Sequence, residues 1–303
     1  LGEVMAVSDR VLVLRAGKLS GERRPAETTR AELAALMVGQ EGAAPAIAAP
    51  APGQPVLVLE NVTTAPGAGV GLDGLSLTLS AGEIVGLAGV SGNGQAALAA
   101  VLGGAAKPAS GEIRTAGRRL AQWTPAAALD RGIARIPEDR HASGSIADMS
   151  VTENVIAEAY RSPRFSRAGF IDWKAARGFA AKLIRDYDVK CPSPETPIRL
   201  LSGGNMQKLI LGRALDPDPS VIVANQPTRG LDIGAVAYVH ARLIEARDRG
   251  AAILLVSEDL EEIMALSDRI VVMSKGRLST PSRRGERTIA QLGELMAGHE
   301  EAA

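Results

Sequence analysis

Short, unbroken apolar runs alternate along most of the chain with longer segments in which apolar residues recur every three to four positions. Runs of this length are typical of buried strands, and the longer period is typical of amphipathic helices. The expected strands are residues 83–88, 133–137, 220–224 and 252–257, and the expected helices are 152–160, 173–187 and one that begins near Gln95. This alternation from residue 56 onward predicts an α/β domain.

Residues 1–41 repeat residues 260–300 without a gap. The first twenty residues, LGEVMAVSDRVLVLRAGKLS, align with LEEIMALSDRIVVMSKGRLS at 260–279, and LMVGQE at 36–41 aligns with LMAGHE at 295–300. The two segments share 20 identities in 41 positions at a constant offset of 259 residues. Solenoid repeats have periods of roughly 20–50 residues. The long offset therefore predicts that a whole domain is duplicated and that most of the first copy precedes residue 1.

Between the two copies lies GAAPAIAAPAPGQP at residues 42–55, which is rich in alanine and proline and carries no charge. Such a composition cannot build a core, and its prolines favour an extended spacer. We therefore expect three parts. Residues 1–41 form the tail of a first domain, residues 42–55 form a linker, and residues 56–300 form a complete second domain.

The bulk composition excludes several classes of protein. The 34 Lys and Arg residues balance the 34 Asp and Glu residues, so no net charge attracts nucleic acid or an anionic membrane surface. The single cysteine, Cys191, excludes an internal disulfide and suits a reducing compartment. Apolar runs such as 251–256 are far shorter than the roughly 20 residues of a membrane-spanning helix. We expect a chain that reaches a membrane only by docking to another protein.

The segment GVSGNGQ at 89–95 follows a predicted strand and opens a predicted helix, where a phosphate-binding loop would lie. Such a loop normally continues with Lys and with Ser or Thr, but Gln95 and Ala96 occupy those positions. A glycine-rich turn is also common as plain structure, so this segment alone leaves a nucleotide role open. It is not the GxGxxG of dinucleotide-binding enzymes, and no suitable acidic residue follows about twenty residues on. The candidate nucleotide-binding residues are Gly89, Ser91, Gly92, Asn93, Gly94, Gln95 and Ala96.

The segment LSGGNMQK at 201–208 resembles the signature of the ABC ATPases, although LSGG alone would also suit an ordinary serine N-cap. In that family, Ser202 and the backbone at Gly204 would face the γ-phosphate of a nucleotide held by the opposite domain, because a helix N-terminus favours an anion. Met206 departs from the glutamine that is more usual there.

Three further segments carry the same resemblance. The segment SVIVANQPTRGLDIGA at 220–235 resembles the Walker B strand and D-loop, with Asp232 as the D-loop aspartate. Asn225 and Gln226 replace the family's Mg²⁺-binding Asp and water-polarising Glu. Glu258, in VSEDLEE, replaces the switch histidine. Glu138, in IPEDR, stands at the Q-loop glutamine, and residues 61–72 lack an aromatic residue to stack on adenine.

The resemblance implies an α/β fold of the P-loop NTPase class, an ABC-type nucleotide-binding domain. We expect a three-layer core, a small antiparallel β region near 56–79 and an inserted helical subdomain at about 144–215. ATP and Mg²⁺ are the implied cofactors, with Mg²⁺ at the missing first domain's site and no metal ligand here. Without a general base, this domain's own site is expected to hydrolyse ATP negligibly. Its signature, with Ser202 and Gly204, is expected to complete the first domain's site.

Tandem domains with GNGQ, PEDR and QPTRGLD are similar to bacterial importers of simple sugars and nucleosides, and GNGQ with NQPTRGLD favours the nucleoside, basic-membrane-protein-type branch. The implied partners are two integral-membrane permease subunits and a periplasmic or lipoprotein solute-binding protein, at the cytoplasmic face of the membrane. One alternative is a non-hydrolysing regulatory or scaffolding domain. Another is an ABC ATPase that acts on ribosomes or nucleic acid, which the zero net charge and uncharged linker disfavour.

Overall fold

The computed structural model of the 303-residue chain describes residues 2–15, 18–29, 32–33, 36, 52–65, 69–119 and 123–298. Most of the predicted linker, residues 42–51, lies outside the described residues. The ends of the two repeat copies, at 37–41 and 299–300, lie outside them as well. Within the described residues, no helix is long and apolar enough to cross a bilayer.

A mostly parallel sheet forms the centre of the second domain, with the strand order β14-β13-β5-β12-β11-β8 and β15 paired to β13. Its strands are β5 (Ile84–Ala88), β8 (Ile133–Ile136), β11 (Val221–Asn225), β12 (Ala252–Ser257), β13 (Arg269–Ser274), β14 (Arg277–Leu278) and β15 (Ser282–Arg283). Strands β13, β5, β12, β11 and β8 run parallel. The four apolar runs predicted as strands are therefore confirmed as strands, with bounds that shift by one residue.

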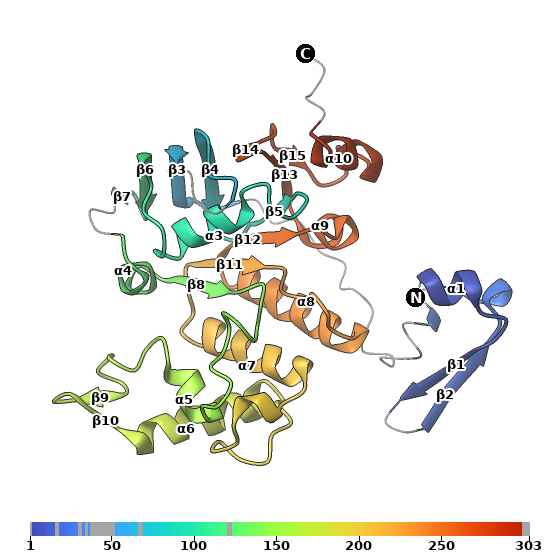
Figure 1. Cartoon of the computed structure of the whole chain (residues 1–303), viewed down its shortest axis with the longest axis horizontal. Coiled ribbons are helices and arrows are strands. Elements are labelled where there is room, and N and C mark those ends of the chain that lie inside the picture. Colours follow the sequence, from blue (N-terminus) through green and yellow to red (C-terminus); the bar gives the residue numbers. More distant parts are fainter. Residues whose placement is uncertain are drawn as a thin grey trace.

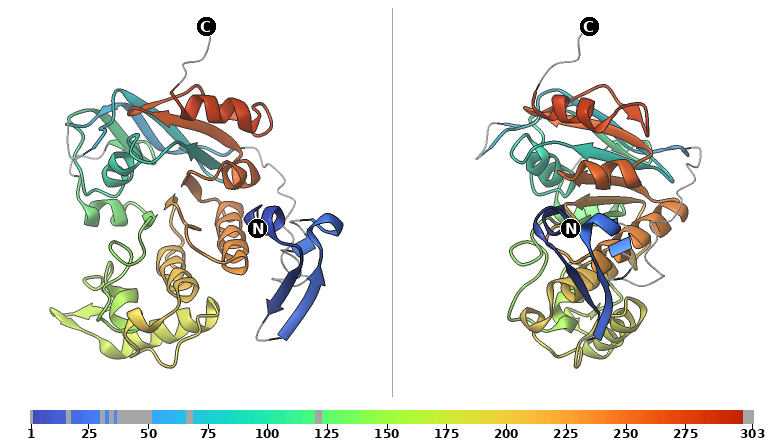
Figure 2. Two further views of the ribbon diagram at one scale, coloured as in Figure 1. Left: turned by 45° about the vertical axis from the view of Figure 1, so that its right-hand side comes forward. Right: turned by 90° about the vertical axis from the view of Figure 1, so that its right-hand side faces the viewer.

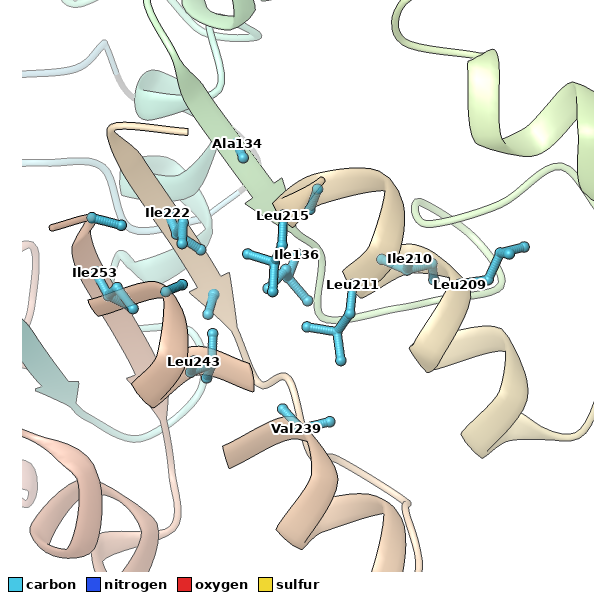
Figure 3. Close-up of a cluster of buried hydrophobic side chains, with 14 of the residues drawn as sticks. Ala134, Ile136, Leu209, Ile210, Leu211, Leu215, Ile222, Val239, Leu243 and Ile253 are labelled. Atoms are coloured by element: carbon cyan, nitrogen blue, oxygen red, sulfur yellow. The ribbon is translucent and has the colours of Figure 1, made fainter. Parts of the chain in front are cut away.

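Side chains alternate between two cores on the two faces of this sheet. On β12, Ile253 and Leu255 join the cluster beneath the helices, whereas Leu254 and Val256 join the cluster beneath an antiparallel sheet. The first face is covered by α7 (Gly203–Leu215), α8 (Ile233–Asp248) and α9 (Leu260–Leu266). Figure 3 shows side chains of β8, β11 and β12 directed toward those of α7 and α8. Burial on both faces explains why these strands are unbroken apolar runs.

The antiparallel sheet covers the other face, together with α3 (Gln95–Leu102). Its order is β4-β3-β6-β7, with β3 (Pro55–Thr63), β4 (Leu75–Ser80), β6 (Ser110–Thr115) and β7 (Arg118–Arg119), and α4 (Pro125–Asp130) follows it. The predicted β region near 56–79 is present but too small, because β6 and β7 extend it to residue 119. In β6 only Ile113 is a large apolar residue, so no hydrophobic run marks the strand.

The segment between β8 and β11 has helices as its longest elements, but they cover only about half of residues 144–215, which were predicted to be mostly helical. It contains α5 (Val151–Ile156), β9 (Ser166–Arg167), β10 (Phe170–Ile171), α6 (Trp173–Asp186), a 3₁₀ turn (Ile198–Leu200) and α7. In Figures 1 and 2 the α5–α6 region and the antiparallel sheet lie at opposite ends of the molecule, with the central sheet between them. The predicted helix at 152–160 is too long, because α5 ends at Ile156. Tight turns follow, in which the Ala159 N–H donates to the Ile156 carbonyl and the Ser162 N–H donates to the Ala159 carbonyl.

The N-terminal repeat copy folds into the same kinds of elements as the second copy. It contains α1 (Gly2–Val7), β1 (Val11–Arg15), β2 (Lys18–Arg23) and a 3₁₀ turn (Pro25–Glu27). The corresponding elements of the second copy are α9, β13 and the strands that follow, and that copy ends with α10 (Ile289–Met296). Leu12 and Leu14 are 51% and 69% exposed, whereas their repeat equivalents Val271 and Met273 are 1% and 0% exposed. The side-chain face that β13 buries beneath the antiparallel sheet is therefore exposed on β1.

Candidate functional site

The glycine-rich loop lies between the end of β5 and the start of α3. Gly94, the N-cap of α3, has a φ of +116°, which L side chains rarely adopt. No side chain caps this helix, so its first N–H groups face the loop. Ser91, Gly92 and Ala96 are exposed. The loop therefore lies between a strand and a helix as predicted, and a glycine-rich turn of this kind can cradle an anion.

The side chain of Gln95 fills this cradle. Its carboxamide oxygen accepts the Asn93 N–H at 3.0 Å, and its Nε2 donates to the Val90 carbonyl at 2.9 Å. Gln95 is only 8% exposed. At Gly89, a Cβ would lie 2.6 Å from Gln95 Nε2, so the loop closes tightly around the carboxamide. One N–H that an anion would need is therefore already bound within the chain.

Asn93 ties the loop to the β13–β14 turn. Its Oδ1 accepts the Lys275 N–H at 3.0 Å, and its carbonyl accepts the Gly276 N–H at 2.8 Å. The same turn is joined to Asp73, whose N–H donates to the Gly276 carbonyl at 3.1 Å. The loop is thus held by two backbone N–H groups of the β13–β14 turn.

Asn225 and Gln226 lie at the same edge of the sheet as the loop, because β5, β12 and β11 are adjacent and parallel. Both side chains are half-buried. Gln226 has a φ of +48°, and its N–H is held by the Val256 carbonyl at 2.8 Å. Glu258 follows β12 directly at this edge and is exposed.

The donor set at this edge does not fit a hydrolytic Mg²⁺ site. Magnesium in such sites is held by carboxylates, a hydroxyl and phosphate oxygens, whereas Asn225 and Gln226 are neutral amides and Ala96 has no hydroxyl. Among the described residues, no cluster of His, Cys, Asp and Glu has the arrangement of a metal site.

Ser202 caps the signature helix α7. Its Oγ accepts hydrogen bonds from the Asn205 N–H at 3.4 Å and from Asn205 Nδ2 at 2.9 Å. Ser202 is exposed, and Gly203 and Gly204 form the first turn with their backbone half-buried. Met206 is 1% exposed within the core, so its departure from the family pattern is absorbed by packing. The start of this 13-residue helix is therefore partly exposed, with its N-cap serine at the surface.

Asp232 lies next to the signature. It caps α8 by accepting the Ala235 N–H at 2.9 Å, and a Cβ added at Gly204 would lie 4.0 Å from Asp232 Oδ2 and 3.5 Å from the Ala235 Cβ. The structure therefore brings together two predicted site segments, the signature and the D-loop. The glycine loop has different neighbours, in Met273 and the β13–β14 turn.

Glu138 pairs with the Arg229 guanidinium of the D-loop segment. Arg140, two residues on, donates to the Arg229 carbonyl at 2.7 Å. Both motifs, PEDR and PTRG, can be read in the sequence, but the contact of their arginines cannot. The opposite charges of Glu138 and Arg229 were the available signal.

A second group that the sequence analysis missed is Glu262, which is 5% exposed behind the D-loop. Its Oε1 accepts the Thr228 hydroxyl at 2.8 Å and lies 2.8 Å from His240 Nε2. Burial alone would raise the pKa of the Glu262 carboxyl, but hydrogen bonds from His240, Ser257 and Thr228 outweigh it and hold the pKa below its ordinary value of 4.5. An ionised carboxylate thus anchors the segment that follows β11.

A cavity of about 710 Å³ lies between β3, β4 and the β13–β14 region. Its charged lining residues are Glu60, Asp73, Arg269 and Arg277, so the two signs balance. None of its lining residues belongs to the glycine loop or the signature. The cavity is therefore separate from both predicted site segments.

Known proteins resemble this chain in sequence. The family model described as ABC transporter matches residues 72–229. The guanosine import ATP-binding protein NupO of Bacillus subtilis (strain 168) is 43% identical over 294 residues, which cover 96% of this chain and 58% of that protein. The nucleoside import ATP-binding protein NupA of Lactococcus lactis subsp. cremoris (strain MG1363) is 38% identical, with 98% and 59% covered. The chain thus spans less than two thirds of the length of these relatives.

Solved structures resemble it in fold. A nucleotide-free ATP-binding cassette from an ABC transporter superposes with a TM-score of 0.64 at 20% identity, covering 81% of this chain and 96% of that one. An ATP-binding cassette solved as a dimer in a post-hydrolysis state with ADP and Pi gives a TM-score of 0.64 at 22% identity, covering 76% and 100%. At these identities the likeness shows the fold alone. Since the family model matches just over half of the chain and the fold agrees, the chain belongs to the ABC transporter family, as an ATP-binding domain.

Proposed function

We propose that this chain is part of a tandem ATP-binding subunit that energises the import of a nucleoside or simple sugar through membrane permeases. In this proposal the second domain does not hydrolyse ATP at its own loop. It instead presents Ser202 and Gly204 to ATP held by the P-loop of a first domain. The partners are two permease subunits and a solute-binding protein, and the subunit lies at the cytoplasmic face of the membrane.

The observation that carries the proposal is the contrast between the two anion sites of one domain. The glycine loop is filled by the carboxamide of Gln95, and the sheet edge beside it has amides in place of carboxylates. Ser202, the N-cap of α7, is exposed, and Gly203 and Gly204 behind it are half-buried. A domain whose glycine loop is filled by a carboxamide, but whose signature serine is exposed, is suited to act on a nucleotide that another domain binds.

The N-terminal copy supports the tandem arrangement. Its outward-facing Leu12 and Leu14 are exposed, although the equivalent residues Val271 and Met273 are buried beside β5. Two exposed leucines on one face of a strand indicate a missing cover. A first domain with its own antiparallel sheet and α3-like helix would supply that cover, as those elements do for Val271 and Met273 here.

The names of the relatives support the transported class. NupO is named for guanosine import and NupA for nucleoside import. The glucose import ATP-binding protein TsgD13 of Haloferax volcanii is 40% identical over 98% of this chain and 55% of that protein. We favour a nucleoside as the solute, because the relative with the higher identity carries that name.

The test is steady-state ATP hydrolysis by the full-length protein, compared with its Ser202→Arg variant. A bulky cation at the helix cap should block the approach of a nucleotide held by the first domain, so turnover should fall by about a hundredfold or more. Ser110→Arg, at an exposed serine of β6, is the matched control and should turn over like wild type. Equal turnover of wild type and Ser202→Arg would refute the proposal.

The second candidate is a regulatory or scaffolding subunit without hydrolysis in either domain. Two features favour this regulatory function for this half of the protein. The glycine loop is filled by Gln95, and Asn225 and Gln226 are neutral amides. The same assay decides between the two. A full-length protein that shows no turnover in the presence of its permeases would support the regulatory function.

A further inference from the structure

Two sequence motifs, PEDR at 137–140 and PTRG at 227–230, hold each other through arginine contacts in both directions. Arg140 Nη1 donates to the Arg229 carbonyl at 2.7 Å, and Arg140 Nη2 donates to the Gly230 carbonyl at 3.3 Å. Arg229 in turn pairs with the Glu138 carboxylate. We call Glu138, Arg140, Arg229 and Gly230 the arginine latch. It joins the end of β8 to the D-loop.

The guanidinium of Arg140 also lies against the first residue of the signature helix. A Cβ added at Gly203 would lie 3.2 Å from Arg140 Nη2 and 3.3 Å from Nε, which is tighter than nearly all real Cβ contacts. The absence of a side chain at Gly203 therefore lets the guanidinium reach the helix start. Arg140 sits between the signature and the D-loop, and it contacts both.

The segment that carries Arg140 is itself well fixed. Asp139 Oδ1 accepts the N–H groups of His141 and Ala142 at 2.8 and 2.9 Å. Ser145 Oγ donates to the Arg140 carbonyl at 2.7 Å and lies 3.6 Å from the Met206 sulfur of α7. The backbone of Arg140 and its side chain are thus both tied to the region around the signature.

The chemistry of the guanidinium explains why an arginine suits this position. Its two Nη groups form a rigid planar fork that can hold two consecutive carbonyls at once, whereas the three N–H groups of a lysine diverge from one nitrogen on a flexible stem. A cation beside a helix N-terminus is unfavourable by itself, because both are positive, and it becomes favourable when an anion is bound there. The latch is therefore suited to a state in which an anion lies at the start of α7.

We propose that Arg140 is a positioning residue that fixes the D-loop against the start of the signature helix. It thereby sets the spacing of Ser202, Gly204 and Asp232 around a nucleotide bound across the domain interface. This inference rests on the proposed function of the signature. Arg140 acts through these segments, and its own contacts are with their backbone.

The test uses the full-length protein assembled with its permeases, and it compares wild type with Arg140→Gln, Arg140→Lys and Arg177→Gln. Both Arg140 variants should lower kcat by about tenfold or more, because neither presents donors on two separate nitrogens in a rigid fork. The KM for ATP should change by less than about threefold, because the first domain's P-loop supplies most of the binding. Arg177, on α6 and paired with Glu195, is an exposed arginine that should be replaceable without loss.

A double-variant measurement separates positioning from simple structural support. If the latch acts as a unit, Arg140→Gln combined with Arg229→Gln should lower kcat no further than Arg140→Gln alone. The thermal midpoints of the variants should stay close to that of wild type. A fall in kcat that merely follows a loss of folded protein would overturn the inference.

Two further outcomes would also overturn it: wild-type kcat in Arg140→Gln, or full rescue by Arg140→Lys. If Ser202→Arg abolishes turnover while Arg140→Gln does not, the proposed function stands and the latch inference alone fails. If Ser202→Arg has no effect, the proposed function fails, and the latch inference fails with it.

Discussion

Replacing Gln95 should open the glycine loop to phosphate. In wild type, the carboxamide of Gln95 holds the Asn93 N–H and the Val90 carbonyl at 3.0 and 2.9 Å. A phosphate that enters the loop must displace both hydrogen bonds before it can use the freed N–H. Gln95→Ala removes this internal competitor and leaves the glycines and the helix N-terminus in place.

The size of the effect follows from those two hydrogen bonds. Each contributes a net free energy of about 0.5–1.5 kcal/mol, so displacing both costs about 1–3 kcal/mol. Because about 1.4 kcal/mol corresponds to a tenfold change in affinity, Gln95→Ala should bind phosphate-bearing ligands about 5- to 150-fold more tightly than wild type. Gln95→Lys should gain further, since an ammonium adds a charge-assisted hydrogen bond to the anion.

The assay is isothermal titration calorimetry of pyrophosphate and of ADP into the 303-residue chain, with folding checked by thermal unfolding. Gln291→Ala is the matched control, because Gln291 is a glutamine whose amide oxygen caps the backbone of α10, outside the loop. It should bind like wild type. The reasoning is refuted if a folded Gln95→Ala variant binds pyrophosphate no more tightly than wild type, or if wild type already binds as tightly as Gln95→Lys.

Two other predictions test the buried carboxylate and the N-terminal copy. Since the pKa of Glu262 is lowered in the folded state, its contribution to stability is present above its ordinary value of 4.5 and is lost as the pH falls through the folded value. Urea unfolding should therefore show Glu262→Gln less stable than wild type at pH 7, with the difference shrinking toward pH 3; a constant difference would contradict this. Leu14→Asp should leave the thermal midpoint of this chain unchanged, because Leu14 is 69% exposed, but should lower it in the full-length protein if Leu14 is buried there as Met273 is here. An unchanged midpoint in both would argue against a first domain built like the second.

Much of the fold could be predicted because the central strands are buried on both faces. Runs such as those at β11 and β12 are uninterrupted for that reason, and they stand out in the sequence. Strand β6 does not stand out in this way, because its sequence, SGEIRT, contributes one large apolar side chain. It also pairs with a strand about fifty residues earlier. Its place depends on β3, which no local pattern reveals.

The sequence places the candidate-site segments after strands, but it does not reveal the contacts among them. Parallel strands end at one edge, so the glycine loop, Asn225 and Glu258 could be assigned to a common region from their places after strands. The inward turn of the Gln95 side chain could not be predicted, because it depends on the loop backbone. The contact of Arg140 with Gly230 joins segments about ninety residues apart, which become neighbours only because β8 pairs with β11.

The central claim is that the two nucleotide sites of the full-length protein are unequal, and photolabelling measures this most directly. The protein, assembled with its permeases, would be incubated with a photoreactive azido-ATP and vanadate, irradiated, and cleaved in the linker at residues 42–55. We expect label at the first domain's P-loop and little label on peptides containing residues 89–96, with trapping lost in Ser202→Arg. Equal labelling of both P-loops, unaffected by that substitution, would contradict it.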